Sequence, residues 1–225
     1  MPVNPNYSRI LEKEIQRLDE SGIKPRLLLH SCCAPCSSYV MEYLREHFRI
    51  TVFYYNPNIT SNEEYRYRLS EEKRLIEAYN RQVETQDFEG MNSTCNAEKI
   101  EILECPYDPE NYLEAVKGYE DCPEGGDRCG ICFEMRLRKT AEAAREGGYD
   151  FFTTTLTISP LKNAVRLNEI GGRMGAEYGV AFLPSDFKKK NGYKRSIELS
   201  RQFSLYRQNF CGCAFSKREA QDRNT

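Results

Sequence analysis

The 225-residue sequence contains only two histidines, His30 and His47, beside ten cysteines. Imidazole can therefore supply few ligands, and any extensive metal site must be dominated by thiolate, which suits zinc or iron-sulfur clusters. The sequence also lacks an apolar run long enough to cross a bilayer, and its polar, charged start has no signal-peptide core. We therefore expect a cytoplasmic protein that does not associate with membranes.

The bulk composition is that of an ordinary globular chain. Hydrophobic residues make up 40% and charged residues 29%, with a mean hydropathy of -0.70, and this length suits one well-buried core. We expect a single domain over residues 1–225. In a reducing cytoplasm ten cysteines are not expected to form structural disulfides, so metal or redox chemistry is the default interpretation.

Charge is unevenly distributed along the chain. Residues from Asp186 onward carry a net charge of +6, whereas the first 185 residues carry -8. A basic C-terminal segment is compatible with nucleic-acid binding, and also with an ordinary solvated surface.

Strand-like and helix-like segments alternate. Helical spacing covers 7–18, 38–48, 62–80, 128–146 and 161–178, and strand patterns cover 26–30, 50–55, 82–88, 149–156 and 179–184. This alternation predicts a Rossmann-like, doubly wound α/β domain with a parallel sheet. Ligands of such folds bind beyond the carboxyl ends of the strands, so the loops there should share one rim. We expect an insertion at this rim around residues 89–126.

The loop after the first strand lacks the glycines that let backbone amides approach a nucleotide phosphate. Instead, residues 30–38 read HSCCAPCSS, with thiols at Cys32, Cys33 and Cys36. This rim therefore favours metal chemistry over phosphate binding. The glycines of GGRMG at 171–175 fall inside a helical pattern, and we interpret them as packing positions.

Two further cysteine pairs follow. Cys129 and Cys132 form C-x-x-C at a predicted helix start, where the helix dipole favours anionic sulfur. Cys211 and Cys213 are separated by one glycine, which lets the backbone bend closely around a ligand.

Together with the first cluster these pairs supply seven thiols, more than the four that one zinc ion or one four-iron cluster needs. A cluster with a second metal, or a cluster with redox-active thiols, would use the excess. By itself C-x-x-C fits structural zinc or a dithiol equally well. We interpret Cys95 and Cys105 as small apolar residues and leave Cys122 open.

Several motifs, in order, resemble one family. They are LLLHSCCAPCSSYV, VFYYNPNI, EGGDRCGICFEMRL, TTTLTISPLKN, DFKKKNGYKRSIELS and LYRQNFCGCAFS. From about Arg26 to Ser216 the chain closely resembles the cobalamin-independent epoxyqueuosine reductases, the QueH family. The resemblance implies a fold of the adenine-nucleotide α-hydrolase-like (HUP) type. It also implies reduction of epoxyqueuosine to queuosine in the wobble nucleoside of tRNA, the last step of queuosine biosynthesis, with electrons from an external donor.

The resemblance further implies a 4Fe-4S cluster beside a second mononuclear metal ion, described as iron. Neighbouring cysteines point in different directions, so we expect Cys32 and Cys33 to touch different centres. Our hypothesis gives the cluster four ligands, Cys33, Cys129, Cys132 and Cys211, and the second metal three, Cys32, Cys36 and Cys213.

Conversion of an epoxide to an alkene is a two-electron deoxygenation that releases water, and it needs protons as well as electrons. The cluster would relay electrons, and the second metal would act as a Lewis acid on the epoxide oxygen. Candidate proton donors near the rim are His30, Tyr54, Asp186 and Tyr193. For His30 we favour the alternative of a satisfied histidine at a strand end.

A nucleoside substrate in RNA calls for basic groups and aromatic faces. The rim segment DFKKKNGYKRS supplies them as Phe187, Lys188, Lys189, Lys190, Tyr193, Lys194 and Arg195. Lys162 and Asn163 at a predicted helix start are further candidates for holding the base or a phosphate. Helix capping by Ser159 with a solvated lysine is the alternative for that segment.

Three other functions stay open. A non-catalytic zinc module that binds RNA would contain zinc and no sulfide. An iron-sulfur tRNA thiolation enzyme of similar fold would need ATP, and the S-G-G-x-D-S type of loop is missing. A cytosolic dithiol reductase built on C-x-x-C leaves the other five motif cysteines unexplained.

Overall fold

Five parallel strands form the centre of the protein, in the order β3-β2-β1-β4-β5. The computed structural model describes residues 5–88 and 96–222. The strands are β1 (Arg26–His30), β2 (Arg49–Tyr54), β3 (Glu101–Glu104), β4 (Phe151–Thr154) and β5 (Ala181–Phe182). The chain builds outward from β1 to one edge and then returns to place β4 on its other side, so β1 and β4 flank the switch point where such folds bind ligands.

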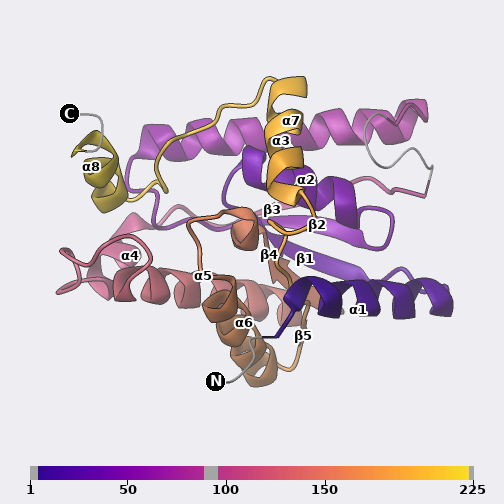
Figure 1. The fold of residues 1–225 in the computed structure, drawn as a ribbon, viewed down its shortest axis with the longest axis horizontal. Helices are drawn as coiled ribbons and strands as arrows, with labels where there is room; N and C mark the ends of the chain where they lie inside the picture. Colours follow the sequence, from indigo (N-terminus) through magenta and orange to yellow (C-terminus); the bar gives the residue numbers. More distant parts are fainter. Residues whose placement is uncertain (1–4, 89–95, 223–225) are drawn as a thin grey trace.

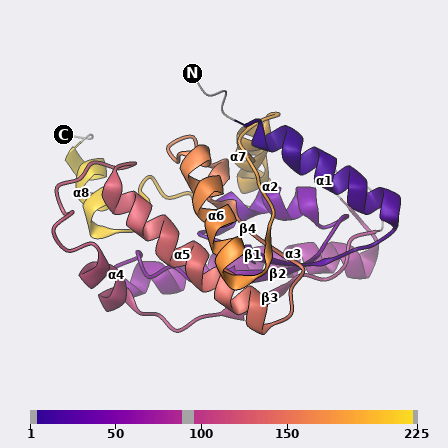
Figure 2. The ribbon, with the colours of Figure 1, turned by 90° about the horizontal axis from the view of Figure 1, so that it is seen from below.

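Helices cover both faces of the sheet (Figures 1 and 2). They are α1 (Tyr7–Ser21), α2 (Ala34–Leu44), α3 (Asn62–Thr85), α4 (Pro109–Ala115), α5 (Asp127–Glu146), α6 (Ala164–Tyr178), α7 (Gly192–Gln202) and α8 (Ala214–Asp222), with a 3₁₀ turn η1 (Thr155–Ile158) after β4. Figure 1 shows α3 and α5 on opposite sides of the sheet. The expected doubly wound α/β fold with a parallel sheet is confirmed.

The side chains of β1 contribute to two hydrophobic cores, one on each side of the sheet, because successive side chains of a strand point to opposite sides. Leu27 and Leu29 pack with apolar residues of α1, α2, α3 and α7. Leu28 packs with those of α5 and α6, including Phe133 and Leu167. At roughly 25 cal/mol per Å² of apolar surface, each such buried leucine contributes about 2 kcal/mol. The two cores hold the ends of β1 and β4 in fixed positions below the rim.

The prediction of a strand at 82–88 was wrong. Helix α3 continues to Thr85, because its buried positions keep helical spacing through Leu75, Tyr79 and Gln82. Gln86 then ends the helix in the left-handed conformation at φ 56°. The missing strand is β3, which pairs with β2 at the sheet edge and lies inside the segment expected to be a rim insertion.

Of the three glycines in the 171–175 segment, two are packing positions, as expected, whereas a Cβ atom at Gly172 would meet open space. They lie within α6, where Gly171 faces the Phe182 ring and Gly175 faces the backbone of Val180, leaving no room for a Cβ atom. Helix α6 can therefore lie directly against β5. Among the described residues, no helix combines the length and the apolar character needed to span a membrane.

Candidate active site at the carboxyl ends of the strands

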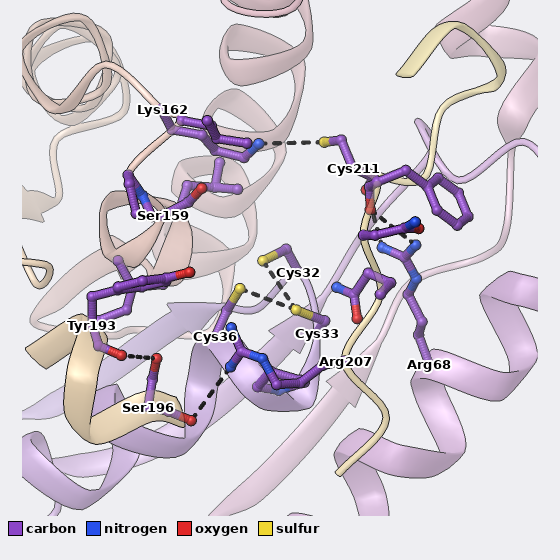
Figure 3. A pocket seen from close by; sticks show the side chains of 18 of the residues that line it. Cys32, Cys33, Cys36, Arg68, Ser159, Lys162, Tyr193, Ser196, Arg207 and Cys211 are labelled. Atoms are coloured by element: carbon purple, nitrogen blue, oxygen red, sulfur yellow. Dashed lines mark hydrogen bonds between the residues drawn. The ribbon is translucent and has the colours of Figure 1, made fainter. Parts of the chain in front are cut away.

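A cavity of about 380 Å³ opens at the switch point between β1 and β4. Its walls come from the cysteine loop after β1, the segment 156–162 after β4, helix α7 and the segment 207–211 before α8. The expectation that loops following different strands meet at one rim is confirmed for β1 and β4. Figure 3 shows the labelled side chains around this space.

Three sulfur atoms lie together on the floor of this cavity. Cys33 is the extended residue that begins α2, and Cys36 lies in the first turn of that helix, whose entry is fixed by Pro35. The Sγ atoms of Cys33 and Cys36 are 3.0 Å apart, and those of Cys32 and Cys33 are 3.8 Å apart. All three sulfurs lie within 4.8 Å of one another, close enough to hold one metal ion.

The three thiols influence one another's protonation. Hydrogen bonds from Cys33 and Cys36 lower the pKa of the Cys32 thiol well below its usual value, and the Arg136 cation adds to this effect. The same hydrogen bonds with Cys32 raise the pKa of the Cys33 thiol and of the Cys36 thiol. One thiolate is therefore stabilised within the group, and a bound cation would stabilise more than one.

The remaining motif cysteines converge from two segments beside this group. Cys129 and Cys132 lie in the first turns of α5, whose start at Asp127 fits the expected position. Cys132 and Cys213 are buried in a shared cluster with Tyr112. Cys211 lines the same cavity as the three clustered thiols.

Two cations accompany these sulfurs. Lys162 Nζ donates to Cys211 Sγ over 3.4 Å, as Figure 3 shows. Arg136, fully buried, donates to Cys132 Sγ at 3.8 Å and to Asn56 Oδ1 at 2.6 Å. Among the described residues, no carboxylate pairs with Arg136. Because a buried charge needs a counter-charge, this arrangement fits sulfur atoms that carry negative charge.

The cysteines that lie together in the structure are not the set that we expected to share one metal centre. Cys33 had been assigned to a centre different from that of Cys32 and Cys36, yet all three sulfurs lie together. Among the described residues they form the one group of three or more ligand atoms at metal-binding spacing. The division between two centres stays a prediction. Cys95 lies outside the described residues.

Among the four candidate proton donors, only Tyr193 lines the cavity. His30 is fully buried, with Nδ1 2.8 Å from Thr154 Oγ1 and Nε2 3.1 Å from the carbonyl of Tyr55. Burial, together with Arg136, lowers its pKa to about 3. It is therefore the satisfied histidine that we favoured.

The other two candidates lie away from the cavity. Tyr54 is completely buried and stacks edge-on against Tyr65. Burial raises the pKa of the Tyr54 hydroxyl well above its usual value. Asp186 pairs with Lys188 at 2.7 Å.

The expected substrate-binding residues separate into two sets. Lys162 and Tyr193 line the cavity. Lys189 and Lys194 are exposed and lie close to Tyr193 in the sequence. Asn163, rather than Ser159, caps α6, its side chain accepting from the amide of Arg166.

Four residues of the basic segment have contacts within the protein instead. Phe187 is buried in the core. Arg195 forms two hydrogen bonds to the buried carboxylate of Glu42, at 2.8 and 3.0 Å. Lys190 pairs with Glu12, and Lys188 pairs with Asp186 as described above. Phe187 and Arg195 are thus held by contacts within the protein, and substrate binding by them stays a prediction. The sequence of a loop does not reveal which of its side chains turn inward.

Sequence reasoning missed several lining residues, among them Arg68, Glu124, Arg207 and Phe210. Arg68 pairs with Glu64 and donates to the carbonyl of Cys211 at 3.0 Å, thereby fixing the Cys211 segment. Nothing in the sequence distinguishes Arg68 from the other basic residues of α3. Glu124 lies within the quoted EGGDRC motif, so attention to its carboxylate could have found it.

Comparison with known proteins adds to this geometry. A sequence model described as "Epoxyqueuosine reductase QueH" matches residues 27–219. This chain belongs to the QueH family. It is 42% identical to "Epoxyqueuosine reductase QueH" of Staphylococcus aureus strain Mu50, over 94% of this chain and 83% of that protein.

Two further relatives carry the same name. The protein of Streptococcus pyogenes serotype M1 is 40% identical over 94% of this chain and 78% of its own length. That of Thermotoga maritima is 33% identical over 88% of this chain and 93% of its own length. The QueH family resemblance noted from the motifs is therefore confirmed, and the family match includes the cavity.

Proposed function

We propose that this QueH-family chain reduces the epoxide of epoxyqueuosine in tRNA to the alkene of queuosine. The main support for this proposal is the family match over residues 27–219, a range that contains every residue lining the cavity described above. The reaction consumes two electrons and two protons, breaks both C–O bonds of the epoxide and releases water. An external donor supplies the electrons.

The residues present fit thiolate-bound metal. Four of the seven motif thiols line the cavity, three of these lie within 4.8 Å of one another, and Lys162 and Arg136 provide counter-charge. We propose that they hold a 4Fe-4S cluster and a second metal ion, divided as predicted above. When bound, the cluster would supply single electrons and the second metal would polarise the epoxide oxygen.

The chain's own side chains position the substrate and move protons. Lys162 lies at the cavity wall, where its ammonium stabilises negative charge that develops on the epoxide oxygen. The phenol of Tyr193 opens to the same cavity and is the proton donor that we propose. Phe210, which lines the cavity, is the aromatic residue that we propose contacts the nucleobase, and exposed Lys189 and Lys194 contact tRNA phosphates.

The deciding experiment measures metal content and reaction together. Protein purified without oxygen is analysed for iron, zinc and acid-labile sulfide, then incubated with tRNA carrying epoxyqueuosine and a chemical reductant. Digested nucleosides are separated by mass. We expect about five irons and four sulfides per chain, and a product lighter by one oxygen atom.

Other outcomes would support the alternatives. Zinc without sulfide, combined with unchanged tRNA after iron reconstitution, would indicate an RNA-binding zinc module. Dependence on ATP with a product that gains sulfur would indicate a thiolation enzyme.

A further inference from the structure

Glu124 is the single carboxylate among the residues that line the cavity. The other charged lining groups, apart from the thiols, are the cations of Arg68, Lys162 and Arg207. A carboxylate in such a place would repel a phosphate, so it is not explained by contact with the RNA backbone. Its charge instead suits a part of the ligand that is itself cationic.

The Glu124 carboxylate has acceptor capacity to spare. Its side chain is only 15% exposed, and its Oε1 forms an ion pair with Lys162 Nζ at 3.8 Å, which is beyond hydrogen-bond distance. That ammonium is closer to Cys211 Sγ, at 3.4 Å. Among the described residues, no group donates a hydrogen bond to the Glu124 side chain, although a carboxylate accepts several.

The turn that carries Glu124 is held firmly in place. The guanidinium of Arg128 donates to the carbonyls of Glu120 and Cys122 and pairs with Glu219 in α8 at 3.0 Å. The second oxygen of Glu219 accepts from the backbone amide of Glu124 at 3.4 Å. Because the turn is fixed from both sides, the carboxylate is preorganised for a ligand.

The proposed substrate contains a matching cation. In epoxyqueuosine the ring with the epoxide is joined to 7-deazaguanine through an aminomethyl group, and an alkylamine of this kind is protonated near neutral pH. Resting on the proposed function, we infer that Glu124 binds this secondary ammonium. It thereby selects 7-deazaguanines with a charged substituent and fixes the epoxide ring relative to the thiol group.

The test compares two anticodon stem-loops that differ in one substituent at the wobble base. One carries 7-aminomethyl-7-deazaguanine, which is cationic, and the other carries neutral 7-cyano-7-deazaguanine. Dissociation constants are measured for the wild-type holoprotein, Glu124→Gln and Glu124→Asp. We expect wild type to prefer the aminomethyl RNA by about tenfold or more, the size of a charge-assisted hydrogen bond.

In Glu124→Gln the preference should fall to near one, whereas Glu124→Asp should keep part of it. The matched control is Glu114→Gln, a 78% exposed position that should behave as wild type. If Glu124 merely orients Lys162, both RNAs weaken equally and the preference survives, which would overturn the inference. Equal wild-type affinity for the two RNAs would overturn it as well.

The failure of the inference is distinguishable from that of the proposed function. Wild-type protein that reduces epoxyqueuosine in tRNA while Glu124→Gln keeps the ammonium preference refutes only the inference. Wild-type protein that prefers the aminomethyl RNA in a Glu124-dependent way, yet leaves epoxyqueuosine unchanged, supports the ammonium site and refutes the reductase.

Discussion

Arg136 and Cys132 lie one helical turn apart on α5, with the guanidinium 3.8 Å from the sulfur and both side chains buried. Burial, together with the neighbouring Cys211 and Cys129 sulfurs, raises the pKa of the Cys132 thiol to about 12, although Arg136 opposes the shift. Without metal, the Cys132 thiol would therefore stay protonated at neutral pH, and Arg136 would depend on the more distant Cys32 thiolate for counter-charge. Metal binding, which deprotonates the Cys132 thiol, would add a counter-charge directly beside the guanidinium.

Replacing Arg136 with Met should therefore weaken metal retention. A buried thiolate or cluster that loses its cation is destabilised by several kcal/mol, on the order measured for broken buried ion pairs. We expect iron to be lost to a chelator at least tenfold faster than from wild type. Arg138→Met is the control, because Arg138 is partly exposed on the same helix and pairs with Glu134 and Glu177. Equal loss rates for Arg136→Met and wild type would contradict this role.

The predicted division of ligands can be read from serine variants. Cys129→Ser should abolish the absorption of the iron-sulfur cluster, whereas Cys36→Ser and Cys213→Ser should keep it and lose the iron that is not accompanied by sulfide. Absorption spectra with iron and sulfide analysis make the measurement. Cys105→Ser serves as the control, since Cys105 packs at the edge of a core. If Cys36→Ser removes the cluster chromophore and Cys129→Ser spares it, the division is wrong.

The sequence was sufficient to predict the features that depend on regular periodicity. The apolar run of β1 and the helical spacing of α5 specify their elements locally, and parallel strands place their carboxyl ends at one rim. Edge strand β3 escaped prediction because it begins and ends with exposed glutamates and buries little surface. It is held by pairing with β2, which no local pattern encodes.

The site was predictable where the chemistry lies in residue type, and not where it lies in orientation. The thiols of Cys32 and Cys33 indicate metal chemistry by residue type alone, whatever the orientation of the side chains. By contrast, Phe187 and Tyr193 look alike in a basic aromatic loop, yet one is buried in the core and the other lines the cavity. Only packing between α2 and α7 decides between those positions.

Arg195 and Lys194, adjacent in sequence, should respond oppositely to removal of their charge. The Arg195 guanidinium holds α7 to α2 through Glu42, whose side chain is only 1% exposed. Arg195→Met should lower the free energy of unfolding by about 2–4 kcal/mol, because it removes an ion-pair partner of a buried carboxylate. Lys194→Met should leave unfolding within about 0.5 kcal/mol of wild type. Urea unfolding measures both values.

The same two variants should also differ in tRNA binding. Lys194→Met should weaken tRNA binding and reduce the slope of log affinity against log salt by about one, because one phosphate contact is lost. Folded Arg195→Met should keep the wild-type slope. A reduced slope for Arg195→Met with unchanged unfolding would restore Arg195 as a phosphate ligand.

Glu72 should make the stability of the metal-free protein fall as pH rises. Its fully buried carboxyl accepts from Ser37 Oγ at 2.6 and 2.8 Å, and burial raises its pKa from 4.5 to about 7. Between these values the folded protein keeps a proton that the unfolded chain has lost. Stability from this group is therefore full below about pH 4.5 and is lost by about pH 8, a difference of about 3 kcal/mol.

Glu72→Gln removes this pH dependence, because the amide cannot ionise in either state. Urea unfolding of metal-free protein at several pH values from 5 to 8 should give a flatter profile for Glu72→Gln than for wild type, with the two curves diverging as pH rises. Glu77→Gln, an exposed position on the same helix α3, should follow the wild-type profile. Parallel curves for wild type and Glu72→Gln would mean that the Glu72 carboxyl titrates at the same pH in the folded protein as in the unfolded chain.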